Sequence, residues 1–117
     1  MSAGNYTWRI SQGAQEQRVF TYLTKGGGAS VDLTDMSAKM QVRPYKGSPE
    51  ALVTLDSEGV GGIVLGGELG TVEVTISSLQ TAGLTSDGYY DIQLIDADEE
   101  VDRFVEGAIK LSLQVTE

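Results

Sequence analysis

The densest group of potentially reactive side chains in this sequence is an acidic run from Asp96 to Asp102. Carboxylates stand at its first, third, fifth and seventh positions, a spacing that calcium-binding loops use for their oxygen ligands. An EF-hand loop would also need glycine at position six and glutamate at position twelve, where this chain has Val101 and Gly107. Two interpretations remain: a looser calcium loop, or a solvated hairpin tip whose charge keeps strand edges from pairing. We favour the hairpin tip.

Beyond that run, the residue types that enzymes use most are missing. The chain has no histidine and no cysteine, which excludes Ser-His-Asp and Cys-His catalysis and ordinary zinc or iron sites. Paired carboxylates could serve glycoside hydrolysis, but the acidic residues fall in expected turns and on exposed strand faces. The glycine-rich segments 25–30 and 59–62 lack the Gly-Lys-Ser/Thr ending of a phosphate-binding loop, and no Ser-x-x-Lys pair lies on an expected helix. We therefore expect no enzymatic activity and no catalytic, cofactor-binding or metal-binding residues.

The charge balance points away from nucleic acid. The formal net charge is −9, from 17 acidic and 8 basic residues, and no two basic residues are adjacent. A nucleic-acid-binding surface needs a positive stripe. No apolar run approaches the ~20 residues of a membrane span, and residues 1–6 have neither a basic nor an apolar signal-peptide segment. We expect a protein made in the cytoplasm without a signal peptide, and neither a nucleic-acid nor a membrane partner.

The elements that would position these residues are short strands separated by turns. Apolar and polar residues alternate in several segments, as in strands with one buried face, and turn residues recur about every 8–12 positions. Residues 77–84 begin with two serines and contain Gly83, which predicts one short helical turn. At 117 residues, we expect a single domain, 1–117. It should be an all-β, Ig-like, two-sheet antiparallel β-sandwich of seven to nine strands, with strands before the hairpin at 6–10, 18–24, 31–34, 36–43, 51–55, 61–65 and 70–76.

The longest expected element is a β-hairpin over residues 88–116, with the acidic run at its tip. Its second arm alternates apolar residues at 109, 111, 113 and 115 with polar ones. Tyr89 and Tyr90 are adjacent, so one should face the core and the other should face outwards or towards a partner. Trp8 lies on the apolar face of segment 6–10, which favours packing in the core. Exposed, coplanar aromatic rings for sugar stacking are the alternative.

Four segments carry a resemblance to a known group. They are Asp-Leu-Thr-Asp-Met-Ser-Ala-Lys-Met-Gln-Val-Arg-Pro from residue 32, Leu-Val-Thr-Leu from 52, Gly-Tyr-Tyr-Asp-Ile-Gln-Leu-Ile-Asp from 88 and Val-Asp-Arg-Phe-Val-Glu-Gly-Ala-Ile-Lys-Leu from 101. Over residues 30–116 the chain resembles the small Ig-like β-sandwich proteins of tailed bacteriophage tails. These include the N-terminal domains of baseplate upper proteins and tail-fibre attachment or collar proteins. The resemblance implies a virion structural protein that packs in rings or docks a fibre, and it carries over no catalytic residue.

From the resemblance we expect a non-enzymatic structural or adaptor protein of the virion, in the tail, baseplate or fibre-attachment region, after synthesis in the host cytoplasm. Its partners would be other virion proteins and further copies of itself, as a homo-oligomer or ring. We expect contacts at the sheet edges and at the glycine-rich loops around 25–29 and 59–70, with Tyr89, Arg103 and Phe104 near an interface. The alternative function is that of a carbohydrate- or calcium-binding β-sandwich module.

Overall fold

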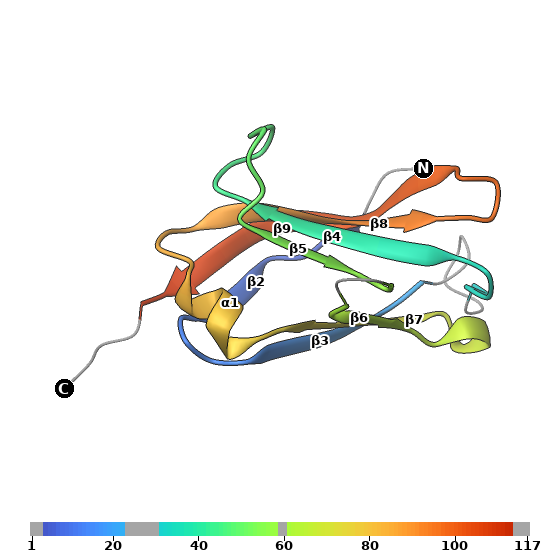
Figure 1. The fold of residues 1–117 in the computed structure, drawn as a ribbon, viewed down its shortest axis with the longest axis horizontal. Helices are drawn as coiled ribbons and strands as arrows, with labels where there is room; N and C mark the ends of the chain where they lie inside the picture. Colours follow the sequence, from blue (N-terminus) through green and yellow to red (C-terminus); the bar gives the residue numbers. More distant parts are fainter. Residues whose placement is uncertain (1–3, 23–30, 59–60, 114–117) are drawn as a thin grey trace.

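In this computed structural model the described residues are 4–22, 31–58 and 61–113, and they form two β-sheets packed face to face (Figure 1). The larger sheet has the order β1–β9–β8–β4–β5, and β2 also pairs with β9. Its strands are β1 (Gly4–Asn5), β2 (Trp8–Ser11), β4 (Ser37–Arg43), β5 (Val53–Asp56), β8 (Gly88–Ile95) and β9 (Val101–Ser112). The smaller sheet has the order β3–β7–β6, with β3 (Glu16–Thr21), β6 (Ile63–Leu65) and β7 (Thr71–Ile76).

The strand order is that of an Ig-like sandwich. If β3 to β9 are taken as strands B, C, C′, D, E, F and G, the sheets are B–E–D and G–F–C–C′. The prediction of an all-β, two-sheet sandwich of seven to nine strands is therefore confirmed. A short 3₁₀ helix, η1 (Gly67–Leu69), precedes β7, and the helix α1 (Ser78–Ala82) follows it.

Helix α1 lies in the stretch where the sequence predicts a helical turn. It begins with a capping box, in which Ser77 Oγ accepts a hydrogen bond from the Gln80 N–H and Gln80 Oε1 accepts one from the Ser77 N–H. The two bonds satisfy backbone donors that have no partner within the helix. The prediction of one short helical turn over 77–84 is confirmed.

β1 and β2 both run parallel to β9, which departs from the predicted antiparallel arrangement at this edge, whereas the other named strands pair antiparallel. β2 pairs in register with β9, with Trp8 opposite Ile109. Gly107 makes the close approach of this segment possible, because a Cβ at Gly107 would lie 2.1 Å from the carbonyl oxygen of Tyr6. That same carbonyl accepts a 2.6 Å hydrogen bond from the buried Tyr90 hydroxyl. Alternation of side chains reports a strand's buried face but carries no information about its direction.

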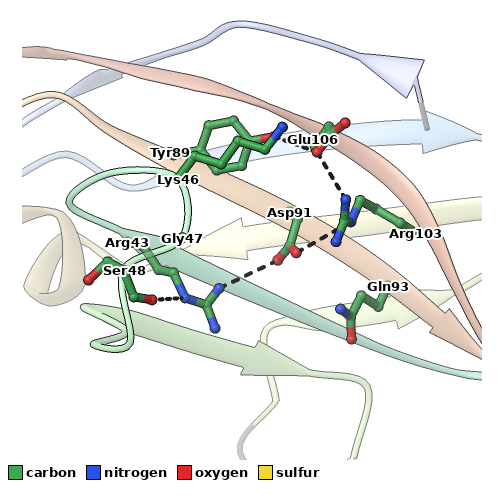
Figure 2. Close-up of a pocket in the computed structure, with 9 residues that line it drawn as sticks. All are labelled: Arg43, Lys46, Gly47, Ser48, Tyr89, Asp91, Gln93, Arg103 and Glu106. Carbon is green, nitrogen blue, oxygen red and sulfur yellow. Dashed lines mark hydrogen bonds and ion pairs between the residues drawn. The ribbon is translucent and has the colours of Figure 1, made fainter. Parts of the chain in front are cut away.

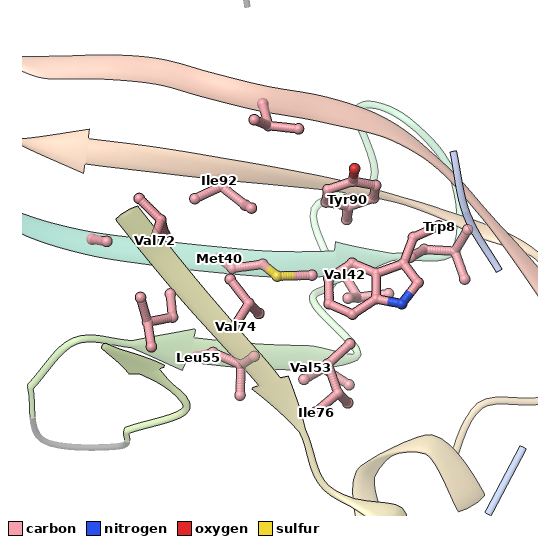
Figure 3. Close-up of a cluster of buried hydrophobic side chains, with 14 of the residues drawn as sticks. Trp8, Met40, Val42, Val53, Leu55, Val72, Val74, Ile76, Tyr90 and Ile92 are labelled. Carbon is pink, nitrogen blue, oxygen red and sulfur yellow. The ribbon is translucent and has the colours of Figure 1, made fainter. Parts of the chain in front are cut away.

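Apolar side chains from the inner faces of both sheets fill the space between them (Figure 3). In β4, β7 and β8 every second residue is buried along most of the strand, as the alternating pattern predicts. Trp8 is fully buried and meets Tyr90 edge-on, with 5.9 Å between ring centroids. Tyr90 thus faces the core and Tyr89 faces outwards, which fixes the side of the sheet on which any exposed site of β8 must lie.

One predicted strand does not form, and all or part of three other predicted segments lie outside the described residues. No strand forms at 31–34; Thr34 and Asp35 lie in a turn, where the Asp32 carboxylate accepts a 2.9 Å hydrogen bond from the Thr34 N–H, and Leu33 points into the core. The predicted contact loop around 25–29, residues 59–60 of the second loop and residues 114–116 of the hairpin lie outside the described residues. Among the residues the structure describes, no helix is long and apolar enough to cross a membrane.

Candidate functional site

The outer face of the larger sheet carries a group of charged and polar side chains on neighbouring strands. Arg43 comes from β4, Tyr89 and Asp91 from β8, and Arg103 and Glu106 from β9; these five residues are called the ionic cluster. Their side chains are neighbours because Arg43 pairs in register with Tyr89, and Asp91 with Glu106. Cross-strand partners on one face lie about 4.5–5.5 Å apart at Cβ, so strand pairing alone brings the charges together.

A β-bulge places Arg103 on this face. The pairing of β8 with β9 shifts between Ile92 and Gln93: Ile92 pairs with Val105 but Gln93 pairs with Arg103, so Phe104 is the extra residue. Phe104 and Val105 both point into the sandwich as a result. Strict alternation would have put Arg103 on the buried side with Val105. The bulge turns it outwards, which is a common use of bulges near functional sites.

Salt bridges connect the members of the ionic cluster (Figure 2). Asp91 lies between the two arginines, 3.9 Å from Arg43 Nη1 and 3.8 Å from Arg103 Nε. Glu106 Oε1 lies 3.5 Å from Arg103 Nη1 and accepts a short hydrogen bond from the Tyr89 hydroxyl. Two carboxylates on adjacent strands would repel each other, and Arg103 neutralises both.

The β4–β5 turn, residues 44–52, extends away from the sheet (Figure 1), and its residues Lys46 to Ser48 lie beside the ionic cluster (Figure 2). Arg43 holds this turn, because its Nε donates a 2.9 Å hydrogen bond to the carbonyl oxygen of Ser48. Lys46 Nζ lies 5.5 Å from the centroid of the Tyr89 ring, a cation–π contact. With the ionic cluster and Gln93, residues Lys46 to Ser48 line an open hollow of about 360 Å³.

The hydrogen bond between Tyr89 and Glu106 shifts the pKa of both groups. Burial and this bond raise the pKa of Tyr89 to about 12. The same bond is the main cause that lowers the pKa of Glu106, and the charges of Lys46 and Arg103 act in the same direction. Near neutral pH, Tyr89 is therefore a neutral donor and Glu106 a charged acceptor.

The cations of the hollow are more exposed than its carboxylates. The Arg103 side chain is 51% exposed, whereas the side chains of Asp91 and Glu106 are 16% and 21% exposed. Lys46, in the turn, is exposed as well. The carboxylates thus lie beneath the cations, and the surface that a partner would meet is mainly positive.

The structure brings together two of the three residues predicted near an interface. Tyr89 and Arg103 both line the hollow. Phe104 faces the interior instead, where it stacks on Tyr22 at 5.0 Å and meets Phe20 edge-on at 6.3 Å. Sequence reasoning did not single out the other members of the site, Arg43, Lys46, Ser48, Asp91, Gln93 and Glu106. Arg43, Asp91 and Gln93 alternate with the buried residues of β4 and β8, so the sequence pattern could have placed them on the outer face.

The two carboxylates of the ionic cluster are poorly arranged for glycoside hydrolysis. That reaction needs one carboxylic acid with a raised pKa as a proton donor. The pKa of Glu106 is lowered, and Arg103 contacts both Glu106 and Asp91. The geometry is that of a network of ion pairs in which both carboxylates are neutralised.

At the β8–β9 tip, the acidic run uses its first carboxylate to shape its own turn. Asp96 Oδ1 accepts hydrogen bonds from the N–H groups of Asp98 and Glu100, both at 2.9 Å. Asp102 accepts a 2.8 Å hydrogen bond from the Tyr22 hydroxyl. Within residues 4–22, 31–58 and 61–113, no three acidic side chains are grouped so that they could hold a metal ion.

The aromatic side chains pack mainly against one another. Trp8 and Tyr90 are buried, and Phe20 meets Tyr6, Trp8 and Phe104 edge-on. Of the described ring pairs, Tyr22 and Phe104 are stacked and the others meet edge-on.

No known protein-family model matches this chain, and no curated protein matches it either.

Proposed function

We propose that this chain is a non-enzymatic structural or adaptor protein of a bacteriophage virion, working by protein–protein assembly in the tail, baseplate or fibre-attachment region. The observation that carries the assembly part is the ionic cluster, a preformed charge network on an exposed sheet face beside an open hollow. Charged residues held in fixed geometry give an interface specificity and orientation. The virion part rests on the resemblance of segments 32–44, 52–55, 88–96 and 101–111 to phage tail proteins.

The sandwich edges also support assembly. In the described chain β3 pairs only with β7, and β5 is the last strand of the larger sheet. Unpaired strand edges promote association unless a neighbour, a charge or a turn covers them. Within a symmetric particle, a neighbouring subunit can cover such an edge.

Immunogold electron microscopy tests this proposal. An antibody against the chain is applied to purified particles produced from the genome that encodes it, with an antibody against a head protein as the positive control. We expect gold label at the tail end of the particle. Detection of the protein in infected cells, together with its absence from purified particles, would contradict the proposal.

A further inference from the structure

Most of the described basic residues of this acidic chain lie on one face, together with Asp91 and Glu106, and the β8–β9 tip is acidic. The outer face of the larger sheet and the turn beside it carry most of the described basic residues, namely Arg9, Lys39, Arg43, Lys46, Arg103 and Lys110. The β8–β9 tip carries Asp98, Glu99 and Glu100, all exposed. Among the described residues, no basic side chain forms a salt bridge with these three.

The tip presents these carboxylates on an ordered turn. The Asp96 N–H donates to the carbonyl of Glu100 at 3.0 Å, and the Glu99 N–H donates to the carbonyl of Asp96 at 2.9 Å. The Asp96 carboxylate closes the same turn, and Glu99 has a positive φ of 63°. Because the backbone is held by its own hydrogen bonds, little conformational entropy would be lost when a partner binds the tip.

The hollow beside the ionic cluster has the complementary charge. Lys46 and the half-exposed Arg103 stand above carboxylates that Arg43 and Arg103 already neutralise. The five charged side chains that line it are three cations and two carboxylates, in a chain whose formal net charge is −9. It is therefore a locally positive recess on an acidic protein.

Among the described residues, no salt bridge joins the hollow and the tip of one molecule. Asp91 and Ile95 are four positions apart on β8, about 13 Å at the usual strand rise, and the tip projects further beyond the end of the sheet (Figure 1). A salt bridge between the two surfaces would therefore join two molecules. Since the two surfaces differ, the contact is head-to-tail, and repetition of it gives a ring or a filament.

We propose that the hollow lined by Lys46, Arg103 and Tyr89 binds the tip carboxylates Asp98–Glu100 of a second copy of this chain. This proposal names the partner for the assembly function above and rests on it. The Lys46 ammonium and the outer nitrogens of Arg103 pair with the incoming carboxylates, and Asp91 and Glu106 hold the Arg103 guanidinium in place beneath them.

Sedimentation velocity over a range of protein concentrations tests the contact. The wild-type chain should self-associate at low salt, about 50 mM, and dissociate at about 0.5 M, because exposed charge pairs are screened. Lys46→Glu and Glu100→Lys should each weaken association by about tenfold or more, since each puts like charges face to face. Lys39→Glu, on the same sheet face but outside the hollow, is the matched control for Lys46→Glu, and Glu73→Lys, on the smaller sheet, is the control for Glu100→Lys.

The charge-swapped pair gives the decisive measurement. The double variant Lys46→Glu/Glu100→Lys should associate again, because the carboxylate introduced in the hollow faces the ammonium introduced in the tip. An equimolar mixture of the two single variants should form heterodimers, because it contains one intact hollow and one intact tip. The Trp8 fluorescence spectrum checks that every variant is folded. Restored association in the swap supports the contact, and so does heterodimer formation.

Two results would overturn the inference: a monomer at every concentration and salt, or an association that neither single variant weakens. These results would refute the contact between tip and hollow without refuting the proposed location in the virion. A monomeric chain that still labels virion tails would refute the tip-to-hollow contact alone. A self-associating chain that is absent from virions would refute the proposed location alone.

Discussion

The substitution Gly107→Ala tests the account of the N-terminal strand most directly. Its Cβ would lie 2.1 Å from the carbonyl oxygen and 2.9 Å from the carbonyl carbon of Tyr6, both backbone atoms that cannot rotate away. To bring this Cβ and the Tyr6 carbonyl oxygen to an ordinary contact distance, the segment around Tyr6 must move by roughly 1 Å. A close-packed interior resists such a shift. The same carbonyl accepts the Tyr90 hydroxyl, so movement also breaks that 2.6 Å bond.

The expected loss follows from these two effects. Overpacking of this kind costs about 1–3 kcal/mol, and a buried hydroxyl left without its acceptor costs about 1–3 kcal/mol. The Gly→Ala change offsets about 0.4–1 kcal/mol by restricting the unfolded chain. We therefore expect Gly107→Ala to lower the free energy of unfolding by about 1–6 kcal/mol, compared with the total stability of about 5–15 kcal/mol typical of proteins.

Denaturant unfolding followed by the fluorescence of Trp8 measures this loss, because Trp8 is the one tryptophan and is fully buried. Gly4→Ala is the matched control: its Cβ would meet its nearest atom at an ordinary 3.6 Å. In a Tyr90→Phe background, which has no hydroxyl to leave unpaired, Gly107→Ala should cost less. If Gly107→Ala and Gly4→Ala differ by less than about 0.5 kcal/mol, the typical error of additivity, the steric argument is wrong.

Three further predictions concern the core, the helix and the ionic cluster. The Trp8 indole N–H is buried with no hydrogen-bond partner among the described residues, so Trp8→Phe should cost clearly less than Trp8→Ala, for which chemical denaturation should give about 3–5 kcal/mol. Ser77→Ala removes the cap that Gln80 completes and should cost about 1 kcal/mol by the same assay. The pKa of Tyr89 is raised from 10.0 to about 12. The folded state is therefore stabilised while the Tyr89 phenol is neutral; this contribution is complete below pH 10 and is lost as the pH rises towards 12. A spectrophotometric titration of the wild type against Tyr89→Phe should show this phenol titrating late, and Glu106→Gln should lower its pKa.

The fold was predictable because its signals are local. The buried positions of β4, β7 and β8 repeat every second residue, which is visible in the sequence. Ser77 before α1 and Gly83 after it mark a helical turn. The parallel direction of β1 and β2 was not visible, because it depends on a contact between Tyr6 and Gly107 across about a hundred residues of chain. Non-local backbone contacts leave no periodic trace.

Apart from Tyr89 and Arg103, the residues of the candidate site were not predicted, for a related reason. The site is made by cross-strand neighbours, and the pairing of Asp91 with Glu106 depends on the register of β8 against β9. A single slip would turn every side chain to the other face. The sequence places Tyr89 on the outer face once Tyr90 is assigned to the core, but it gives no sign that Arg43 and Lys46 will stand beside Tyr89.

The bulge at Phe104 links the core and the site in one local feature. With strict alternation back from Val105, Arg103 would point into the sandwich and Phe104 would point to solvent, which would bury a charge and expose an aromatic ring. One unpaired residue reverses both: Phe104 stacks on Tyr22 inside, and Arg103 reaches Asp91 and Glu106 outside. The bulge is therefore held from both faces, by aromatic packing beneath it and by ion pairs above it. That double constraint explains how a surface arginine on a long strand can be held in a fixed position, which the proposed contact between tip and hollow requires.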